Sequence, residues 1–195
     1  MGIGGPLMRR AVFLDRDGVV NRAVIHNGRP HPPRNVSELE ILPQVPEALS
    51  RLRAAGFLLI VVTNQPDVAR GTTTRESVEE INTKLAAHLP LDALLTCYHD
   101  DAEDCACRKP KPGLLFQARD RFSIDLSRSF MIGDRWRDIE AGIKAGCRTV
   151  FIDYHYDEPR PAAGCLDFCC ASLDEAASWI LSPSEEQEAQ CPSNS

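Results

Sequence analysis

The sequence lacks any hydrophobic run long enough to cross a membrane. Its longest uninterrupted apolar stretch, residues 57–62, has the length of a β-strand, whereas a transmembrane helix needs about 20 apolar residues. The first ten residues contain no apolar segment of secretory length, and Pro6 stands where a myristoylation signal requires Ser or Thr. We therefore expect no membrane association and a cytoplasmic location.

The chain also lacks an excess of positive charge. Its formal net charge of −6 argues against a surface that coats nucleic acid, although it permits a local basic pocket for a phosphorylated small molecule. The 195 residues are 43% apolar and 26% charged, which is typical of a globular protein with one sizeable core. We expect a monomer that acts on a small phosphorylated metabolite and binds no nucleic acid.

The ends of the chain carry no periodic pattern. Residues 1–9 are expected to form a flexible leader, within which Met8 is an alternative start, and residues 182–195 a disordered tail. Residues 10–181 are expected to form a single domain. Eight cysteines without an export signal indicate metal ligands or small buried side chains, not disulfides.

Short apolar runs alternate with segments of helical periodicity throughout this domain. We expect strands near residues 11–14, 57–62, 93–98, 129–132, 149–152 and 167–170, and helices near 46–55, 73–89, 112–122, 135–146 and 172–181. Residues 22–35, which are rich in Pro, Gly and His, are expected to form a long loop or flap. Strands that alternate with helices predict a doubly wound, parallel α/β sheet.

The first strand ends in two carboxylates, Asp15 and Asp17, followed by Gly18. This pattern also occurs in ordinary turns. In an open parallel sheet, however, ligands bind beyond the carboxyl ends of the strands. Two carboxylates this close together favour a cation such as Mg²⁺, which takes one or two carboxylates and completes its shell with water and substrate phosphate.

Two further strands end in polar groups suited to a phosphate, namely Thr63 with Asn64, and Asp134. This set can carry phosphoryl transfer: Asp15 would attack phosphorus and form an aspartyl-phosphate, and Asp17 would protonate the leaving oxygen and later deprotonate water. Asp134 would hold Mg²⁺ together with Asp15. Hydrogen bonds to the phosphoryl oxygens would come from Thr63, from Asn64 and from Lys109, which belongs to the cationic segment 108–113.

Two close pairs of metal-binding residues follow the third expected strand. They are Cys97 with His99, and Cys105 with Cys107. Three thiolates and one imidazole have the number and type of ligands of a closed tetrahedral zinc site. Such an ion would stabilise a loop that has little core of its own.

Four motifs, in order, resemble those of the haloacid dehalogenase (HAD) superfamily of phosphatases: Asp15-Arg16-Asp17-Gly18-Val19-Val20-Asn21, Thr63-Asn64-Gln65, Arg108-Lys109-Pro110, and Gly133-Asp134 with Asp138. The resemblance implies a HAD-like Rossmannoid fold over residues 10–181. It implies that Asp15 is the nucleophile and Asp17 the proton donor, and that Asp15, Asp134 and the main-chain carbonyl of Asp17 hold Mg²⁺. It also implies that Thr63 and Lys109 stabilise the phosphoryl group, that Arg108 contacts the substrate, and that Asn64 and Gln65 line the pocket.

The zinc-type loop followed by Arg-Lys-Pro-x-Pro-Gly is similar to D-glycero-D-manno-heptose-1,7-bisphosphate phosphatases and to histidinol-phosphatase domains. The resemblance implies removal of the 7-phosphate of the heptose bisphosphate. Histidinol phosphate is an alternative substrate, since the loop between His99 and Cys105 is short. Arg135 and Pro66-Asp67 depart from the heptose-enzyme pattern. A zinc-stabilised binding protein with a dead site is the alternative of a different class.

The spacing between the motifs leaves no room for a separate cap domain, so we expect an open site covered by loops alone. Asp138 is interpreted either as a carboxylate that holds Lys109 or as a surface acid. Arg137 and Lys144 are interpreted as charges that balance acids on a solvated helix.

Overall fold

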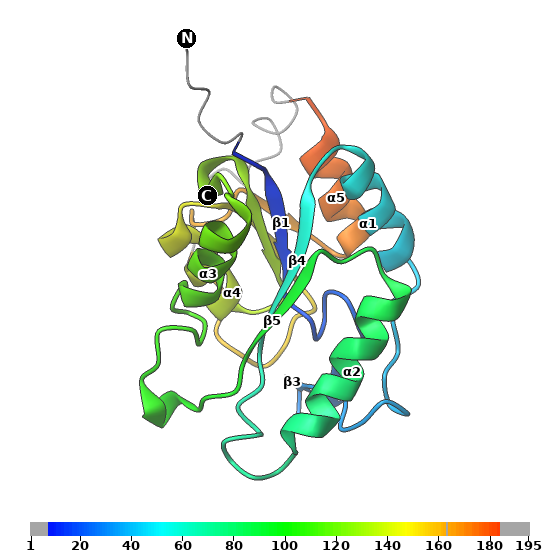
Figure 1. The fold of residues 1–195 in the computed structure, drawn as a ribbon, viewed down its shortest axis with the longest axis vertical. Helices are drawn as coiled ribbons and strands as arrows, with labels where there is room; N and C mark the ends of the chain where they lie inside the picture. The colour runs from blue at the N-terminus through cyan, green and yellow to red at the C-terminus, as the bar shows by residue number, and fades with distance from the viewer. Residues whose placement is uncertain (1–7, 163, 184–195) are drawn as a thin grey trace.

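The computed structural model describes residues 8–162 and 164–183, so most of the predicted leader and tail lies outside the described residues. Within the leader, Arg9 exchanges backbone hydrogen bonds with Ser123 and Asp125. A six-stranded sheet forms the centre of the molecule, in the order β5-β4-β1-β6-β7-β8, and every pairing in it is parallel (Figure 1). Its strands are β1 (Ala11–Leu14), β4 (Leu58–Asn64), β5 (Ala93–Cys97), β6 (Phe130–Gly133), β7 (Arg148–Ile152) and β8 (Phe168–Cys170).

Helices cover both faces of this sheet. They are α1 (Val45–Ala54), α2 (Arg75–His88), α3 (Gly113–Phe122), α4 (Trp136–Ala145) and α5 (Leu173–Leu181), with short 3₁₀ turns at Asp101–Glu103 and Leu126–Arg128. The apolar strand residues alternate between two core clusters, one shared with α1, α2 and α5 and the other with α3 and α4. Because the strands are buried on both faces, their sequences are continuous apolar runs. The predicted doubly wound α/β fold is confirmed.

Local signals set the helix ends. Ser172 caps α5 by accepting a hydrogen bond from the Glu175 amide, as an N-cap serine does. Gly146, which adopts a φ of 82°, ends α4 because glycine carries no penalty in the left-handed region. The helix expected from Thr73 begins one residue later, since the Thr74 side chain, not that of Thr73, accepts from the Ser77 amide.

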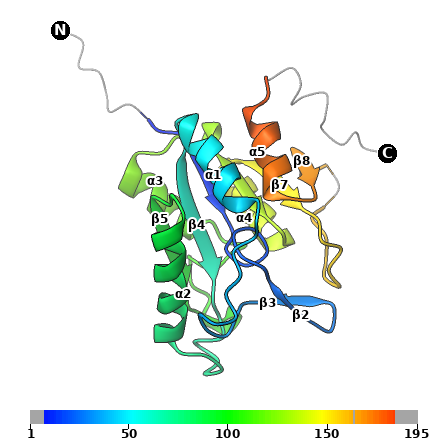
Figure 2. The ribbon, with the colours of Figure 1, turned by 90° about the vertical axis from the view of Figure 1, so that its right-hand side faces the viewer.

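The segment expected to be a flap contains regular structure. Strands β2 (Val24–His26) and β3 (Arg29–His31) form an antiparallel hairpin that projects from the sheet (Figure 2). Its two turn residues, Asn27 and Gly28, have positive φ angles of 51° and 74°, as a type I′ turn requires. The Asn-Gly signal was present in the sequence, and the hairpin within the expected loop or flap was missed.

The carboxyl ends of the strands meet along one edge of the sheet. The chain runs from β1 outward to β4 and β5, and then returns to place β6 on the other side of β1. Such a reversal opens a crevice beyond β1. Within the described residues, the β2-β3 hairpin is the only sheet structure inserted between β1 and α1. No helix of the described part of the chain is both long and apolar enough to span a bilayer.

Candidate active site

Asp15, the residue after β1, forms a buried ion pair with Lys109. The Nζ atom of Lys109 lies 2.8 Å from Oδ1 of Asp15 and 2.6 Å from Oδ1 of Asp138, and it also donates to the Val62 carbonyl. Burial lowers the pKa of Lys109, but the two carboxylates outweigh it and hold that pKa above its ordinary value. The structure therefore selects one interpretation of Asp138, which is 1% exposed and holds Lys109.

Ionisation of the Asp15 carboxyl is disfavoured despite its pairing with Lys109. Burial, followed by the negative charge of Asp138, raises the pKa of Asp15 to about 6. Both of its hydrogen bonds, from Lys109 Nζ and from the Arg16 amide, go to Oδ1. Among the described contacts Oδ2 accepts no bond, and Asp15 lines the cleft described below. The Oδ2 atom is therefore suited to attack an electrophile.

Asp17 accepts four hydrogen bonds. Arg16 donates from Nε and Nη2 at 3.2 and 3.1 Å, Asn21 donates from Nδ2 at 3.0 Å, and Gln65 donates from Nε2 at 2.8 Å. These four bonds fix the position of the Asp17 carboxylate beside Asp15. Gln65 is 1% exposed and also bonds to the Thr63 hydroxyl. Gln65 thus holds Asp17 in place, and it lines a second cavity that shares His31, Pro32 and Asp67 with the cleft described below. Its contact with substrate stays a prediction.

Asp134, the residue after β6, is buried, and neither of its carboxylate oxygens has a well-formed hydrogen bond. Burial, and next the charges of Asp15 and Asp138, raise its pKa well above the ordinary value. The Tyr156 hydroxyl lies near enough to act against this rise in the pKa. One carboxylate oxygen from each of these three residues lies within 4.8 Å of the others. Both oxygens of Asp138 are already engaged, one by Lys109 Nζ and the other by the Arg135 amide. Asp15, with Oδ2 unpaired, and Asp134 are therefore the carboxylates that fit a divalent cation such as Mg²⁺.

The polar end of β4 faces the same edge. Thr63 and Asn64 both line the cleft. The Asn64 side chain accepts from the Lys109 amide at 3.1 Å and donates to the Lys109 carbonyl at 3.0 Å. Asn64 therefore fixes the backbone of Lys109, in addition to the contact with substrate that was expected of it.

A cleft of about 270 Å³ opens over Asp15, Asp17 and Lys109. Cationic and acidic side chains line it in similar numbers; the arginines are Arg29, Arg70, Arg108, Arg135 and Arg137. Arg135 pairs with Glu158 at 2.8 Å. Arg137 had been interpreted as a solvated surface charge, but it lines this cleft, whereas Lys144 pairs with Glu140 on the exposed face of α4.

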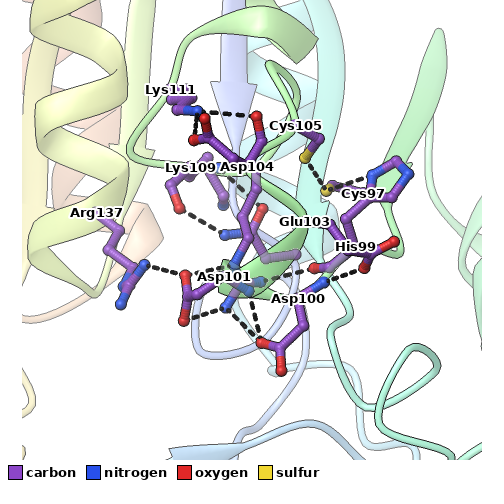
Figure 3. Close-up of polar contacts among 12 residues, drawn as sticks. Cys97, His99, Asp100, Asp101, Glu103, Asp104, Cys105, Lys109, Lys111 and Arg137 are labelled. Atoms are coloured by element: carbon purple, nitrogen blue, oxygen red, sulfur yellow. Dashed lines mark hydrogen bonds and ion pairs between the residues drawn. The ribbon is translucent and has the colours of Figure 1, made fainter.

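The predicted zinc ligands converge at the end of β5 (Figure 3). The three sulfur atoms lie 3.2 to 3.7 Å apart, and His99 Nδ1 lies 3.3 Å from Cys107 Sγ. None of these cysteines forms a disulfide. A tetrahedral zinc ion with bonds of about 2.3 Å places its sulfur ligands about 3.7 Å apart. Cys97, His99, Cys105 and Cys107 therefore have both the chemistry and the spacing to hold zinc.

Two residues of the site were missed at the level of sequence. Arg16 is fully buried, and its Nη1 atom donates to Asn82 of α2 at 2.9 Å while its other nitrogens hold Asp17. Asn82 bonds in turn to Thr96 of β5. The available signal was an amide on the otherwise apolar face of α2, beside Val78, Ile81 and Leu85, because a buried polar group requires a partner.

Comparisons with known proteins agree with this geometry. The model of the haloacid dehalogenase-like hydrolase family matches residues 22–146. Proteins named D-glycero-beta-D-manno-heptose-1,7-bisphosphate 7-phosphatase are 38% identical over 156 residues in Pasteurella multocida (74% of this chain, 82% of the relative) and 32% identical over 183 residues in Escherichia coli K12 (88% and 87%).

Solved structures share the fold along most of the chain. The D,D-heptose 1,7-bisphosphate phosphatase from B. bronchiseptica, complexed with magnesium and phosphate, superposes with a TM-score of 0.71 at 28% identity, covering 88% of this chain and 98% of that one. A HAD-like phosphatase from Mesorhizobium loti gives a TM-score of 0.72 at 27% identity, with coverages of 99% and 94%. The chain therefore belongs to the haloacid dehalogenase-like hydrolase family, and the expectation that it is a phosphatase of this family is confirmed.

Proposed function

We propose that this protein is a Mg²⁺-dependent phosphomonoesterase that acts through an aspartyl-phosphate and removes the 7-phosphate of D-glycero-D-manno-heptose 1,7-bisphosphate. The observation that carries the chemistry is the buried Asp15-Lys109 pair at the carboxyl edge of β1, where Asp15 lines a cleft together with Asp17 and several arginines. A purely structural protein gains nothing from burying two ionised carboxylates around one lysine.

Asp15, Asp134 and the main-chain carbonyl of Asp17 would hold the magnesium ion. Bound there, Mg²⁺ would neutralise the buried carboxylates and attract the oxygens of the phosphate. The buried oxygens of Asp134, neither of which has a well-formed hydrogen bond, support this assignment, because buried charges without strong partners are costly.

The remaining steps belong to side chains. Asp15 attacks phosphorus through Oδ2, while Lys109 and the hydroxyl of Thr63 stabilise the equatorial oxygens as charge spreads over them. Asp17 gives a proton to the departing sugar oxygen and then takes one from the water that hydrolyses the aspartyl-phosphate. Asn64 holds Lys109 in position through two hydrogen bonds to the Lys109 backbone.

The choice of a bisphosphate rests on the cleft and on the relatives. Arg108 lines the cleft beside Lys109, where a guanidinium suits a second phosphate group of the substrate. Relatives that match 74% to 88% of the chain carry the heptose bisphosphatase name. The zinc cluster, in this proposal, stabilises the loop that bears Arg108.

Phosphate release from a substrate panel tests this function. The panel contains both anomers of the heptose 1,7-bisphosphate, histidinol phosphate and common sugar phosphates, each with Mg²⁺ and with EDTA. We expect a strong, Mg²⁺-dependent preference for one heptose bisphosphate, and loss of activity in Asp15→Asn but not in Asp120→Asn, which alters an exposed acid paired with Arg119. A preference for histidinol phosphate would refute the substrate, and full activity of Asp15→Asn would refute the mechanism.

A further inference from the structure

We infer that Asp101, in the turn enclosed by the zinc-type cluster, is a positioning residue that holds Arg108 and Arg137 in place for a second anionic group of the substrate. The inference deepens the proposed function and rests on it. Nothing in the four sequence motifs points to Asp101, which lies between the two halves of the cluster and on the wall of the cleft.

The carboxylate of Asp101 bridges two guanidinium groups from separate elements. Arg108 donates from Nε to Oδ1 at 2.8 Å and from Nη2 to Oδ2 at 3.3 Å, and Arg137 of α4 donates from Nη1 to Oδ1 at 3.1 Å (Figure 3). The bridge therefore joins the turn between the two halves of the zinc-type cluster to α4.

This arrangement leaves donors of both arginines available to a ligand. A guanidinium has five N–H groups, and Arg108 uses one on each nitrogen: Nε and Nη2 on Asp101, and Nη1 on the His99 carbonyl. One N–H on each terminal nitrogen thus makes no hydrogen bond, although Asp100 Oδ1 lies 4.0 Å from Nη2. Because the side chain of Arg108 is only 10% exposed and is fixed at three points, these two groups keep a set direction.

The turn that carries Asp101 is itself held in place. Asp100 accepts from the Asp101 amide, and Glu103 accepts from the Asp100 amide at 2.7 Å. Arg70, from the loop between β4 and α2, donates to both carboxylate oxygens of Asp100 at 2.6 and 2.9 Å. Zinc bound to the cluster, as proposed, would fix the two ends of this turn at His99 and Cys105. Asp101 is therefore a fixed anchor, and the arginines that it binds lose less entropy when an anion arrives.

The test compares two substrates that differ only in the second phosphate, D-glycero-D-manno-heptose 1,7-bisphosphate and the 7-monophosphate. In Asp101→Asn we expect KM for the bisphosphate to rise about tenfold, the change that losing one well-placed charge-assisted contact produces. We expect kcat for the bisphosphate and both constants for the monophosphate to change little. Arg137→Gln should shift the same KM in the same direction, and Asp101→Glu should restore part of the preference.

Asp104→Asn is the matched control. Asp104 lies in the same loop and pairs with Lys111, but it does not line the cleft, and asparagine tolerates its left-handed backbone, with φ of 45°. An equal loss in this variant, or a loss for both substrates in Asp101→Asn, would show a general effect on the loop and overturn the inference. Retained preference in Asp101→Asn would overturn it as well. A wild-type enzyme without any preference for the bisphosphate would instead refute the proposed function.

Discussion

The backbone of Gly18 lies directly against the carboxylate of Asp134. A Cβ atom on Gly18 would collide with Oδ2 of Asp134, and Gly18 has a φ of +94°. The first loop and the end of β6 are thus in contact at the oxygens proposed to bind Mg²⁺. Glycine is required here twice, for the backbone conformation and for the space.

Gly18→Ala should therefore abolish Mg²⁺ binding. Its matched control is Gly56→Ala, because Gly56 has a φ of +87° with no atom within 4 Å of the added methyl group. Both variants should lose about 1–2 kcal/mol of stability through left-handed backbone strain. Only Gly18→Ala should also lose the increase in thermal midpoint on addition of Mg²⁺. An unchanged Mg²⁺ response in Gly18→Ala would contradict the assigned site.

Lys109→Met should both inactivate and destabilise the protein. The substitution leaves the carboxylates of Asp15 and Asp138 buried without their shared cation, and breaking a buried pair costs about 3–5 kcal/mol. Lys111→Met is the control, since Lys111 lies two residues further on, and its ion pair with Asp104 is exposed. Urea unfolding at pH 7.5 measures the stability of both variants. Comparable stability of the two variants would show that the Asp15-Lys109-Asp138 cluster contributes little.

The sequence predicted the site residues at the strand ends because their position in the chain also fixes their position in space. Asp15, Thr63 and Asp134 each follow a run of buried strand residues, and parallel strands bring such ends together at one edge. The cysteine-histidine loop was predicted for the same reason of proximity, since its four ligands lie within eleven residues of one another in the chain. Short-range patterns of this kind need no knowledge of the tertiary structure.

Contacts between distant segments could not be predicted in this way. Arg16 reaches Asn82 across 66 residues, and Arg137 reaches Asp101 across 36. Arginine is ordinarily a surface residue, so the sequence did not predict these contacts. The packing of α2 against the sheet decides what Arg16 contacts, and the packing of α4 decides what Arg137 contacts. The bond from Gln65 to Asp17 spans 48 residues and was missed for the same reason.

Zinc removal should unfold the loop between His99 and Cys107. We expect metal analysis of the purified protein to give one zinc per chain, and Cys105→Ser to lose it together with several degrees of thermal midpoint. Cys165→Ser is the control, because Cys165 is an exposed free thiol outside the cluster. Protein that contains no zinc, and whose stability is the same in both variants, would refute the structural role of the cluster.

The effect of Mg²⁺ should depend on pH in a direction set by Asp15 and Asp134. Burial raises the pKa of Asp15 to about 6, and that of Asp134 also lies well above its ordinary value. Mg²⁺ binds the ionised carboxylates, so below about pH 6 its apparent affinity should fall about tenfold per pH unit for each proton displaced.

The metal-free protein should respond in the opposite direction. A folded pKa of about 6 lies above the unfolded value of about 3.9, so the folded state binds the additional proton and its stability gains as the pH falls from 7 toward 4. Thermal midpoints in EDTA and in saturating Mg²⁺, at pH 7.5 and pH 5, measure both effects. The increase in thermal midpoint caused by Mg²⁺ should be large at pH 7.5 and small at pH 5. In Asp15→Asn, the part of the pH dependence in EDTA that comes from this carboxyl should disappear. An equal Mg²⁺ effect at the two pH values would mean that these carboxylates do not bind the ion.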